Sequence, residues 1–249
     1  MQGIMGDGYI TSPGIASLLY DHPCFGTSSG KPRQGVDLQR SDVHDAVSHL
    51  LSLLDADPDK IGIIGFSYSA AHAVKAASLD RRIKAVVSIN SVIRGSRLLG
   101  LMISDRTSAD ALIWEDSERR RTGGGEIGYL PIYKTVGTPE NIAFSPTDEV
   151  AEYYLEMQRA EIADGGEWRN GDAIQSLLNI REYNIVEGMK VLTPENLLII
   201  VDKDSVRRGE DWKAFEATGE GGEIVGEFVT IEGGHFDSLT EGRGLEKVN

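Results

Sequence analysis

One short stretch, residues 61–72, constrains the fold of this chain more than any other. It reads Ile-Gly-Ile-Ile-Gly-Phe-Ser-Tyr-Ser-Ala-Ala-His, an apolar run followed by a turn of small residues and the start of a helix. Gly65 and Ser69 stand two residues before and after Ser67, which allows a tight, strained turn that raises the serine hydroxyl above the strand end. The N–H of Tyr68 would then point at a developing oxyanion. The stretch indicates a nucleophilic serine, and a serine that caps a helix after a buried strand is the alternative.

The rest of the sequence alternates short runs rich in Val and Ile with amphipathic helical segments. This alternation predicts an α/β fold, in which a mostly parallel sheet is covered by helices on both faces. The length of 249 residues suits a single domain, 1–249. We expect strands at residues 15–20, 60–65, 83–89, 196–201 and 227–231, and helices at 38–54 and 68–79.

The alternation stops after the strand expected at 83–89. Residues 91–194 are helical in pattern, charged and interrupted by glycines. We therefore expect 91–194 to form a helical lid or cap inserted into the domain.

A serine hydroxyl is a weak nucleophile until an imidazole takes its proton and a carboxylate orients that imidazole. His235 follows the last expected strand in a Gly-Gly-His sequence, which is the context expected of the base. Two carboxylates, Asp202 and Asp204, follow the strand at 196–201. We favour Asp204 as the acid because it lies farther into the loop, and Asp202 remains the alternative.

The other histidines have different contexts. His44 and His49 lie in the first expected helix and are interpreted as surface or packing residues. His72 lies one turn beyond the elbow and is expected to orient its helix. His22 follows the strand at 15–20, at the expected edge of the site, and is a candidate for substrate contact.

Charge and composition exclude several classes of protein. The net charge of −14 at pH 7 repels phosphate backbones and acidic lipid surfaces, so we expect neither nucleic acid nor a membrane as a partner. The apolar runs are too short to span a bilayer and no secretory signal is visible, which predicts a cytoplasmic protein. Cys24 is the single cysteine, and no metal cluster or dinucleotide fingerprint is present, so we expect no cofactor.

Several further motifs accompany the elbow. They include Tyr20-Asp21-His22 with Phe25-Gly26, the segments 30–34 and 57–62, the segment 80–88, Trp168-Arg169-Asn170, and Gly233-Gly234-His235-Phe236-Asp237. With these motifs the sequence resembles α/β-hydrolases related to dienelactone hydrolases and X-Pro peptidase-like esterases, including the fungal polyketide transferase and thiohydrolase family. The resemblance extends from Leu18 to Leu239.

The resemblance implies a catalytic triad of Ser67, Asp204 and His235, with Tyr68 as an oxyanion donor. It also implies substrate-binding roles for Phe25 and Trp168, beside His22. Relatives carry further strands and a His-Gly loop, the source of a second oxyanion donor, ahead of the segment that matches residues 15–20. Only fourteen residues precede Ile15, so we expect the N-terminal strands and that donor to be missing. Relatives also add a closing helix after the histidine, which predicts a shortened chain, a fragment or a diverged member.

These observations predict a serine hydrolase that acts on an ester or thioester of a small metabolite through an acyl-enzyme. Two alternatives remain: a polyketide acyltransferase with the same triad, and a catalytically impaired α/β-hydrolase-like binding protein. In each case we expect a small-molecule acyl compound as the partner, and the oligomeric state is unknown.

Overall fold

A computed structural model describes residues 14–26, 28–30, 34–53, 55–103, 106–122, 125–135, 143, 148–192, 196–202, 208–218 and 226–237. These residues form two compact units. The first contains the described residues of 1–30, 36–94 and 184–249, and the second contains those of 31–35 and 95–183. The expectations about missing N-terminal strands and a closing helix fall mostly on residues 1–13 and 238–249, outside the described residues.

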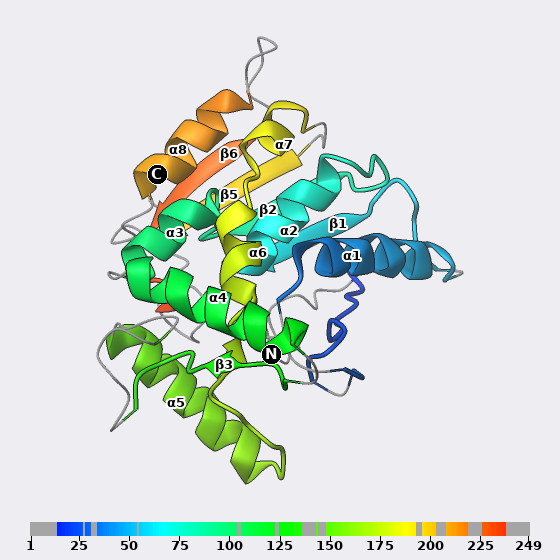
Figure 1. The fold of residues 1–249 in the computed structure, drawn as a ribbon. Coiled ribbons are helices and arrows are strands. Elements are labelled where there is room, and N and C mark those ends of the chain that lie inside the picture. The colour runs from blue at the N-terminus through cyan, green and yellow to red at the C-terminus, as the bar shows by residue number, and fades with distance from the viewer. Residues whose placement is uncertain are drawn as a thin grey trace. The chain divides into compact units, whose positions relative to one another are not determined.

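The first unit is built on a four-stranded sheet in the order β1-β2-β5-β6 (Figure 1). All three strand pairs are parallel, with Ile64 beside Val87 and Ile199 beside Phe228 in the register. The carboxyl ends of parallel strands meet at one edge of a sheet, so the segments that follow these strands gather there. The strands are β1 (Gly62–Phe66), β2 (Ala85–Ile89), β5 (Asn196–Asp202) and β6 (Glu227–Ile231), which confirms four of the five expected strands.

The helices of this unit form a continuous layer. They are α1 (Val36–Leu51), α2 (Tyr68–Ala77), α7 (Val186–Lys190) and α8 (Arg208–Ala217). Helix α2 packs on β1 and β2 and contacts α1 and α7, while α8 contacts α7 and β5. Most of the side chains that α2 buries are alanines, which let the helix approach the sheet closely. Among the described residues, no helix is both long enough and apolar enough to cross a membrane.

The prediction of a strand at residues 15–20 is wrong. These residues belong to neither a helix nor a strand, and Ile15, Leu19 and Tyr20 are 59%, 45% and 40% exposed. Apolar and β-branched residues favour a strand only where a neighbouring strand accepts and donates the ladder hydrogen bonds. Within the described part of the chain β1 is the edge of the sheet, and its neighbour is β2.

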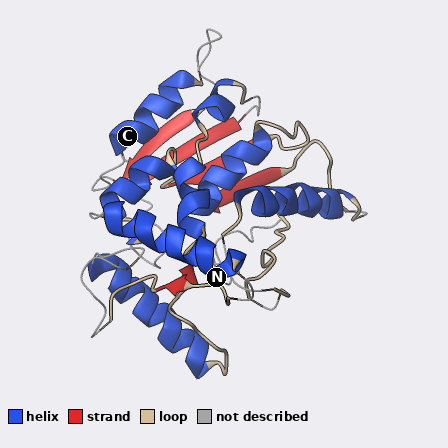
Figure 2. Ribbon diagram, viewed as in Figure 1, coloured by secondary structure: helices blue, strands red, loops and turns tan. Residues whose placement is uncertain are grey.

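The second unit is mainly helical, and apart from the described residues of 31–35 it lies within the insertion expected at 91–194. Helix α6 packs against α3 and α4. A pair of two-residue antiparallel strands, too short to show a pattern in the sequence, joins Tyr129 to Ala173 (Figure 2). The elements are α3 (Gly95–Met102), α4 (Arg106–Arg121), β3 (Tyr129–Leu130), α5 (Asp148–Ala163), β4 (Asp172–Ala173) and α6 (Ser176–Glu182). Its role as a lid stays a prediction.

Asn170 fixes the chain beside this strand pair. Its Oδ1 accepts hydrogen bonds from the N–H groups of Ile132 and Tyr133 at 2.9 and 3.1 Å. Its Nδ2 donates to the carbonyl of Tyr133 at 2.8 Å. One amide side chain therefore replaces the backbone partners that strands of two residues cannot supply.

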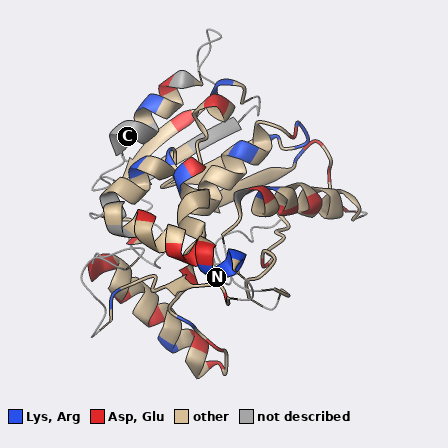
Figure 3. Ribbon diagram, in the orientation of Figure 1, with Lys and Arg blue, Asp and Glu red and all other residues tan. Residues whose placement is uncertain are grey.

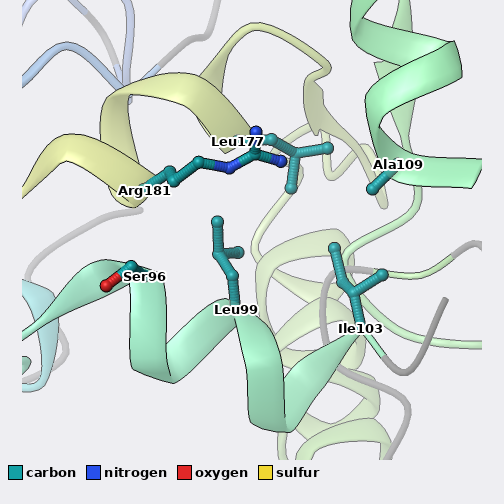
Figure 4. A pocket seen from close by; sticks show the side chains of 6 residues that line it. All are labelled: Ser96, Leu99, Ile103, Ala109, Leu177 and Arg181. Atoms are coloured by element: carbon teal, nitrogen blue, oxygen red, sulfur yellow. The ribbon is translucent and has the colours of Figure 1, made fainter. Parts of the chain in front are cut away.

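A cavity of about 20 Å³ lies among α3, α4 and α6 (Figure 4). Leu99 of α3 and Ile103, the residue after α3, point into it opposite Leu177 of α6. A volume of this size holds about one water molecule. The cavity is therefore a packing gap in the second unit rather than a substrate site.

Acidic side chains lie along α4, and three arginines follow together in its last turn (Figure 3). One of the acidic side chains, Asp116, is fully buried. Its carboxylate accepts hydrogen bonds from Arg119 Nη2 at 2.5 Å, from the Gly128 N–H at 2.9 Å and from Gln175 Nε2 at 2.9 Å. Burial raises the pKa of Asp116, but the three donors outweigh that effect and the pKa lies below its usual value. Asp116 thus connects α4 to the chain ahead of β3 and to the start of α6.

Replacing Asp116 with Ala removes the acceptor of two hydrogen bonds that tie α4 to other segments. Their donors are the Gly128 N–H and Gln175 Nε2. We expect Asp116→Ala to lower the free energy of unfolding by about 2–4 kcal/mol, measured by urea denaturation. The matched control is Asp110→Ala, because Asp110 lies on the same helix, is 59% exposed and forms an exposed ion pair with Arg181 of α6. We expect that variant to lose less than about 1 kcal/mol.

The lowered pKa of Asp116 predicts that the folded protein loses stability in acid. A lowered folded pKa stabilises the folded protein above the unfolded value, near pH 4, and this contribution is lost as the pH falls through the folded pKa. The difference in stability between wild type and Asp116→Ala should therefore shrink on acidification. Equal losses in the two variants at pH 7 would contradict the buried role of Asp116.

Candidate active site

Ser67 lies in a strained turn between β1 and α2. Its φ of 53° and ψ of −113° belong to a region that residues other than glycine rarely adopt. Two backbone hydrogen bonds hold the turn: the Ser67 N–H donates to the carbonyl of Ile89 at 2.8 Å, and the Val92 N–H donates to the carbonyl of Ser67 at 3.3 Å. The end of β2 thus sustains the strain, as the nucleophile-elbow pattern requires.

Gly65 is required by this turn. A Cβ at this position would lie 2.4 Å from the carbonyl oxygen of Ser69 and 2.7 Å from the Cα of Ala70. Both contacts are with backbone, which cannot move aside without opening the turn. Gly62, on the same strand, differs, because a Cβ there would meet Ala85 at 3.6 Å, an ordinary contact distance.

We therefore expect Gly65→Ala to destabilise the protein by about 3 kcal/mol or more and to displace Ser67. The control Gly62→Ala adds the same methyl group to β1 and should change stability by less than about 1 kcal/mol. Thermal unfolding monitored by circular dichroism compares the two variants. Similar melting temperatures would show that the elbow does not depend on glycine at position 65.

His235 faces the serine. Its Nε2 lies 3.1 Å from Ser67 Oγ, within the range for proton transfer. The ring is also held by aromatic neighbours, with the Phe66 and Phe236 ring centroids 4.9 and 4.8 Å away. This distance joins a residue that follows β1 to one that follows β6, at opposite edges of the sheet.

The loop that carries His235 closes on itself. Asp237 Oδ2 accepts a hydrogen bond from the Gly234 N–H at 2.9 Å, and the Asp237 N–H donates to the Gly234 carbonyl at 3.3 Å. Gly233 has a φ of 117°, and a Cβ there would lie 2.5 Å from Asp237 Oδ2. The glycines and the aspartate of the Gly-Gly-His-Phe-Asp motif therefore serve the structure of the loop itself, apart from any role of its histidine.

The acid of the triad stays a prediction. Asp204 lies outside the described residues. Asp202 ends β5, and its side chain is also outside the described part of the chain. The preference for Asp204 over Asp202 therefore rests on the sequence alone.

Tyr68, the predicted oxyanion donor, is the first residue of α2. Its N–H lies at the positive end of the helix dipole, directly after Ser67. The side chain of Ser67 makes no capping hydrogen bond to this helix. The alternative of a capping serine is thus not what the geometry shows, and the hydroxyl faces His235 instead.

Two further histidines lie behind Tyr68. The His72 ring contacts the Tyr68 ring edge to face at 4.7 Å, and it is only 2% exposed. Burial, together with the charges of His22 and Arg40, lowers the pKa of His72 to about 3, so this ring is neutral at physiological pH. His22 Nδ1 lies 2.9 Å from Asp42 Oδ2 on α1, and its ring centroid is 6.2 Å from that of His72.

The remaining predicted residues are distributed over both units. Phe25 follows His22 in the same turn, where its N–H donates to the His22 carbonyl at 3.0 Å. Trp168 belongs to the second unit, with its ring centroid 6.0 Å from that of Tyr154. The structure brings Ser67, Tyr68 and His235 together, while substrate contacts by His22, Phe25 and Trp168 stay predictions.

The two histidines of α1 differ from each other. His49 is exposed. His44 Nδ1 lies 3.0 Å from Asp80 Oδ2, and Asp80 also accepts hydrogen bonds from Arg82. His44 therefore joins α1 to the turn after α2.

Sequence reasoning missed one residue of this site. Asn90 directly follows β2, and its Nδ2 donates a hydrogen bond to the backbone carbonyl of His235 at 3.0 Å. Its φ is 50° and it is 1% exposed. An asparagine after a buried strand is a signal for a left-handed residue, but nothing in the sequence indicates its partner, 145 positions away.

Known proteins resemble this chain in sequence. A family profile described as X-Pro dipeptidyl-peptidase (S15 family) matches residues 7–123. Polyketide transferase claH of Penicillium crustosum is 42% identical over 203 residues, which cover 79% of this chain and 64% of claH. Thiohydrolase apmlB of Arthrinium phaeospermum is 30% identical over 242 residues, covering 91% of this chain and 74% of apmlB. The chain thus spans less than two thirds of the length of claH.

Solved structures resemble it in fold. The structure of DcsB in complex with its substrate analogue has a TM-score of 0.72 at 23% identity, covering 90% of this chain and 74% of DcsB. The α/β hydrolase GrgF from Penicillium sp. sh18 has a TM-score of 0.68 at 21% identity, with the same coverage. The predicted fold class is thereby confirmed.

Proposed function

The chain belongs to the α/β-hydrolase family that includes fungal polyketide transferases and thiohydrolases, and from this we propose that it transfers the acyl group of a small-molecule ester or thioester through Ser67. The observation that carries the proposal is the 3.1 Å separation of His235 Nε2 and Ser67 Oγ. A serine and an imidazole in contact at a strained strand-to-helix turn are suited to nucleophilic acyl chemistry.

In the first step Ser67 Oγ attacks the carbonyl carbon of the substrate while His235 Nε2 takes the hydroxyl proton. The carbonyl oxygen becomes an oxyanion, which the Tyr68 N–H stabilises. One such donor is worth about 10²–10³ in rate. The tetrahedral intermediate then expels an alcohol or a thiol, which receives the proton from His235, and an acyl ester of Ser67 remains. Asp204, with Asp202 as the alternative, orients the imidazole.

In the second step His235 takes a proton from the acceptor, whose oxygen attacks the carbonyl carbon of the acyl ester. The bond to Ser67 Oγ then breaks, and His235 returns the proton to Ser67 Oγ. Water as acceptor gives a hydrolase, and an alcohol gives an acyltransferase. The names of the relatives include both thiohydrolase and polyketide transferase. We place hydrolysis first, because it needs no second binding site.

A fluorophosphonate probe tests the nucleophile. Ser67 Oγ forms a bond to phosphorus, fluoride leaves and His235 takes the hydroxyl proton, so labelling needs no knowledge of the natural substrate. We expect wild type to be labelled at Ser67, as located by peptide mass spectrometry, and Ser67→Ala to be unlabelled. Ser78→Ala, at the other end of α2, is the control and should be labelled as fast as wild type.

A folded wild-type protein that stays unlabelled would reject the enzyme and support the alternative of a binding protein. Circular dichroism of each sample confirms folding.

The acceptor is tested with an acyl thioester and a thiol-detecting reagent. We expect wild type to release thiol and free acid in equal amounts, and Ser67→Ala to release neither above the background rate. The same reaction is then repeated with added small alcohols. Ester that forms faster than free acid, analysed by liquid chromatography, would identify a transferase and overturn hydrolysis as the main reaction.

A further inference from the structure

The end of β2 contacts both members of the proposed catalytic pair. The carbonyl of Ile89, the last residue of β2, accepts the hydrogen bond from the Ser67 N–H at 2.8 Å. The next residue, Asn90, donates from Nδ2 to the carbonyl of His235 at 3.0 Å. Two consecutive residues therefore hold the backbone of the nucleophile and the backbone of the base.

Asn90 is itself firmly placed. It is 1% exposed, and its N–H donates to the carbonyl of Ile200 on β5 at 2.9 Å. Its backbone amide thus continues the pairing of β2 with β5 by one residue, while its side chain reaches the loop after β6. The bond from Nδ2 crosses between segments that are 145 positions apart in the chain.

The loop needs such a support. His235 must reach Ser67 from beyond β6, while the Asp237 contacts described above are local to the loop. Two glycines precede the histidine, and Gly233 has a positive φ, so the backbone has little stiffness of its own. A shift of about 1 Å at a catalytic group can cost about 10² in rate.

The chemistry of position 90 favours asparagine. The φ of 50° is adopted readily by Gly, Asn and Asp, and at a cost by residues with larger or branched side chains. Of these three, glycine has no side chain, and an ionised aspartate only accepts hydrogen bonds. Asparagine alone combines the left-handed backbone with an N–H donor for the His235 carbonyl.

We propose that Asn90 is a positioning residue that sets the separation of His235 from Ser67, with the end of β2 as the common support of both. This role rests on the proposed function, because it assigns Asn90 to the same acyl-transfer site. In this role Asn90 acts through the backbone of His235.

Three variants separate the backbone from the hydrogen bond. Asn90→Gly keeps the left-handed backbone and removes the donor. Asn90→Asp keeps the size and the backbone but turns an oxygen toward the His235 carbonyl. Val86→Ala is the control for lost stability alone. It truncates a side chain that is 1% exposed on β2, the strand that precedes Asn90.

The readouts are the maximal rate of Ser67 phosphonylation, the probe concentration at half that rate, and the melting temperature. We expect Asn90→Gly to lower the maximal rate 10- to 100-fold with the half-saturating concentration within 3-fold, and Asn90→Asp to lower it at least as much. Val86→Ala should lower the melting temperature while the rate stays within 2-fold of wild type. If Asn90→Gly does not fold, Asn90→Asp carries the same test.

Wild-type rates in both Asn90 variants would overturn the proposal. So would an equal loss of rate in Val86→Ala, because the effect would then follow stability alone.

Failure of the proposed function is distinguishable from failure of this inference. If wild type is not labelled at all, hydrogen exchange of the amides at 232–237 still tests whether Asn90 holds the loop. Faster exchange confined to these amides in Asn90→Gly supports the positioning role, and unchanged exchange rejects it.

Discussion

The parallel pairing of β1 with β2 is the interaction on which the site depends. Its ladder does not end with the strand, since the Ser67 N–H continues it to the carbonyl of Ile89. A hydrogen bond at the strand end thus becomes a restraint on a residue with a positive φ. Strained conformations persist only where the surrounding structure over-determines them, and here the sheet itself does so. The position of Ser67 is therefore fixed by the same hydrogen bonding that fixes β1.

Much of the first unit could be predicted because its signals are local. Runs of Val and Ile identify buried strands, and small residues around Ser67 identify the elbow from the sequence alone. The proximity of His235 to Ser67 could be predicted because a histidine in a glycine loop after a strand is the context expected of the base. Each of these inferences depends on residues within a few positions of one another.

The features that could not be predicted depend on distant partners. Residues 15–20 have the composition of a strand, but a strand exists only with a neighbour, which composition does not specify. Strands β3 and β4 have two residues each, and the side chain of Asn170 holds the chain just beyond β3 by hydrogen bonds to Ile132 and Tyr133. The hydrogen bond from Asn90 to His235 could not be predicted for the same reason, since its donor and acceptor are 145 positions apart.

At the start of α2, the hydroxyl of Ser67 could either cap the helix and stabilise the fold or face His235. A serine before a helix ordinarily caps it, and losing a cap costs about 1 kcal/mol. Ser67 cannot both cap α2 and face His235, and its side chain makes no capping bond. The first turn gains other support from the edge-to-face contact of Tyr68 with His72 and from the buried alanine face of the helix. Because burial keeps His72 neutral, this contact does not vary with charge near neutral pH. The helix thereby holds the Tyr68 N–H in place while the serine hydroxyl stays directed at His235.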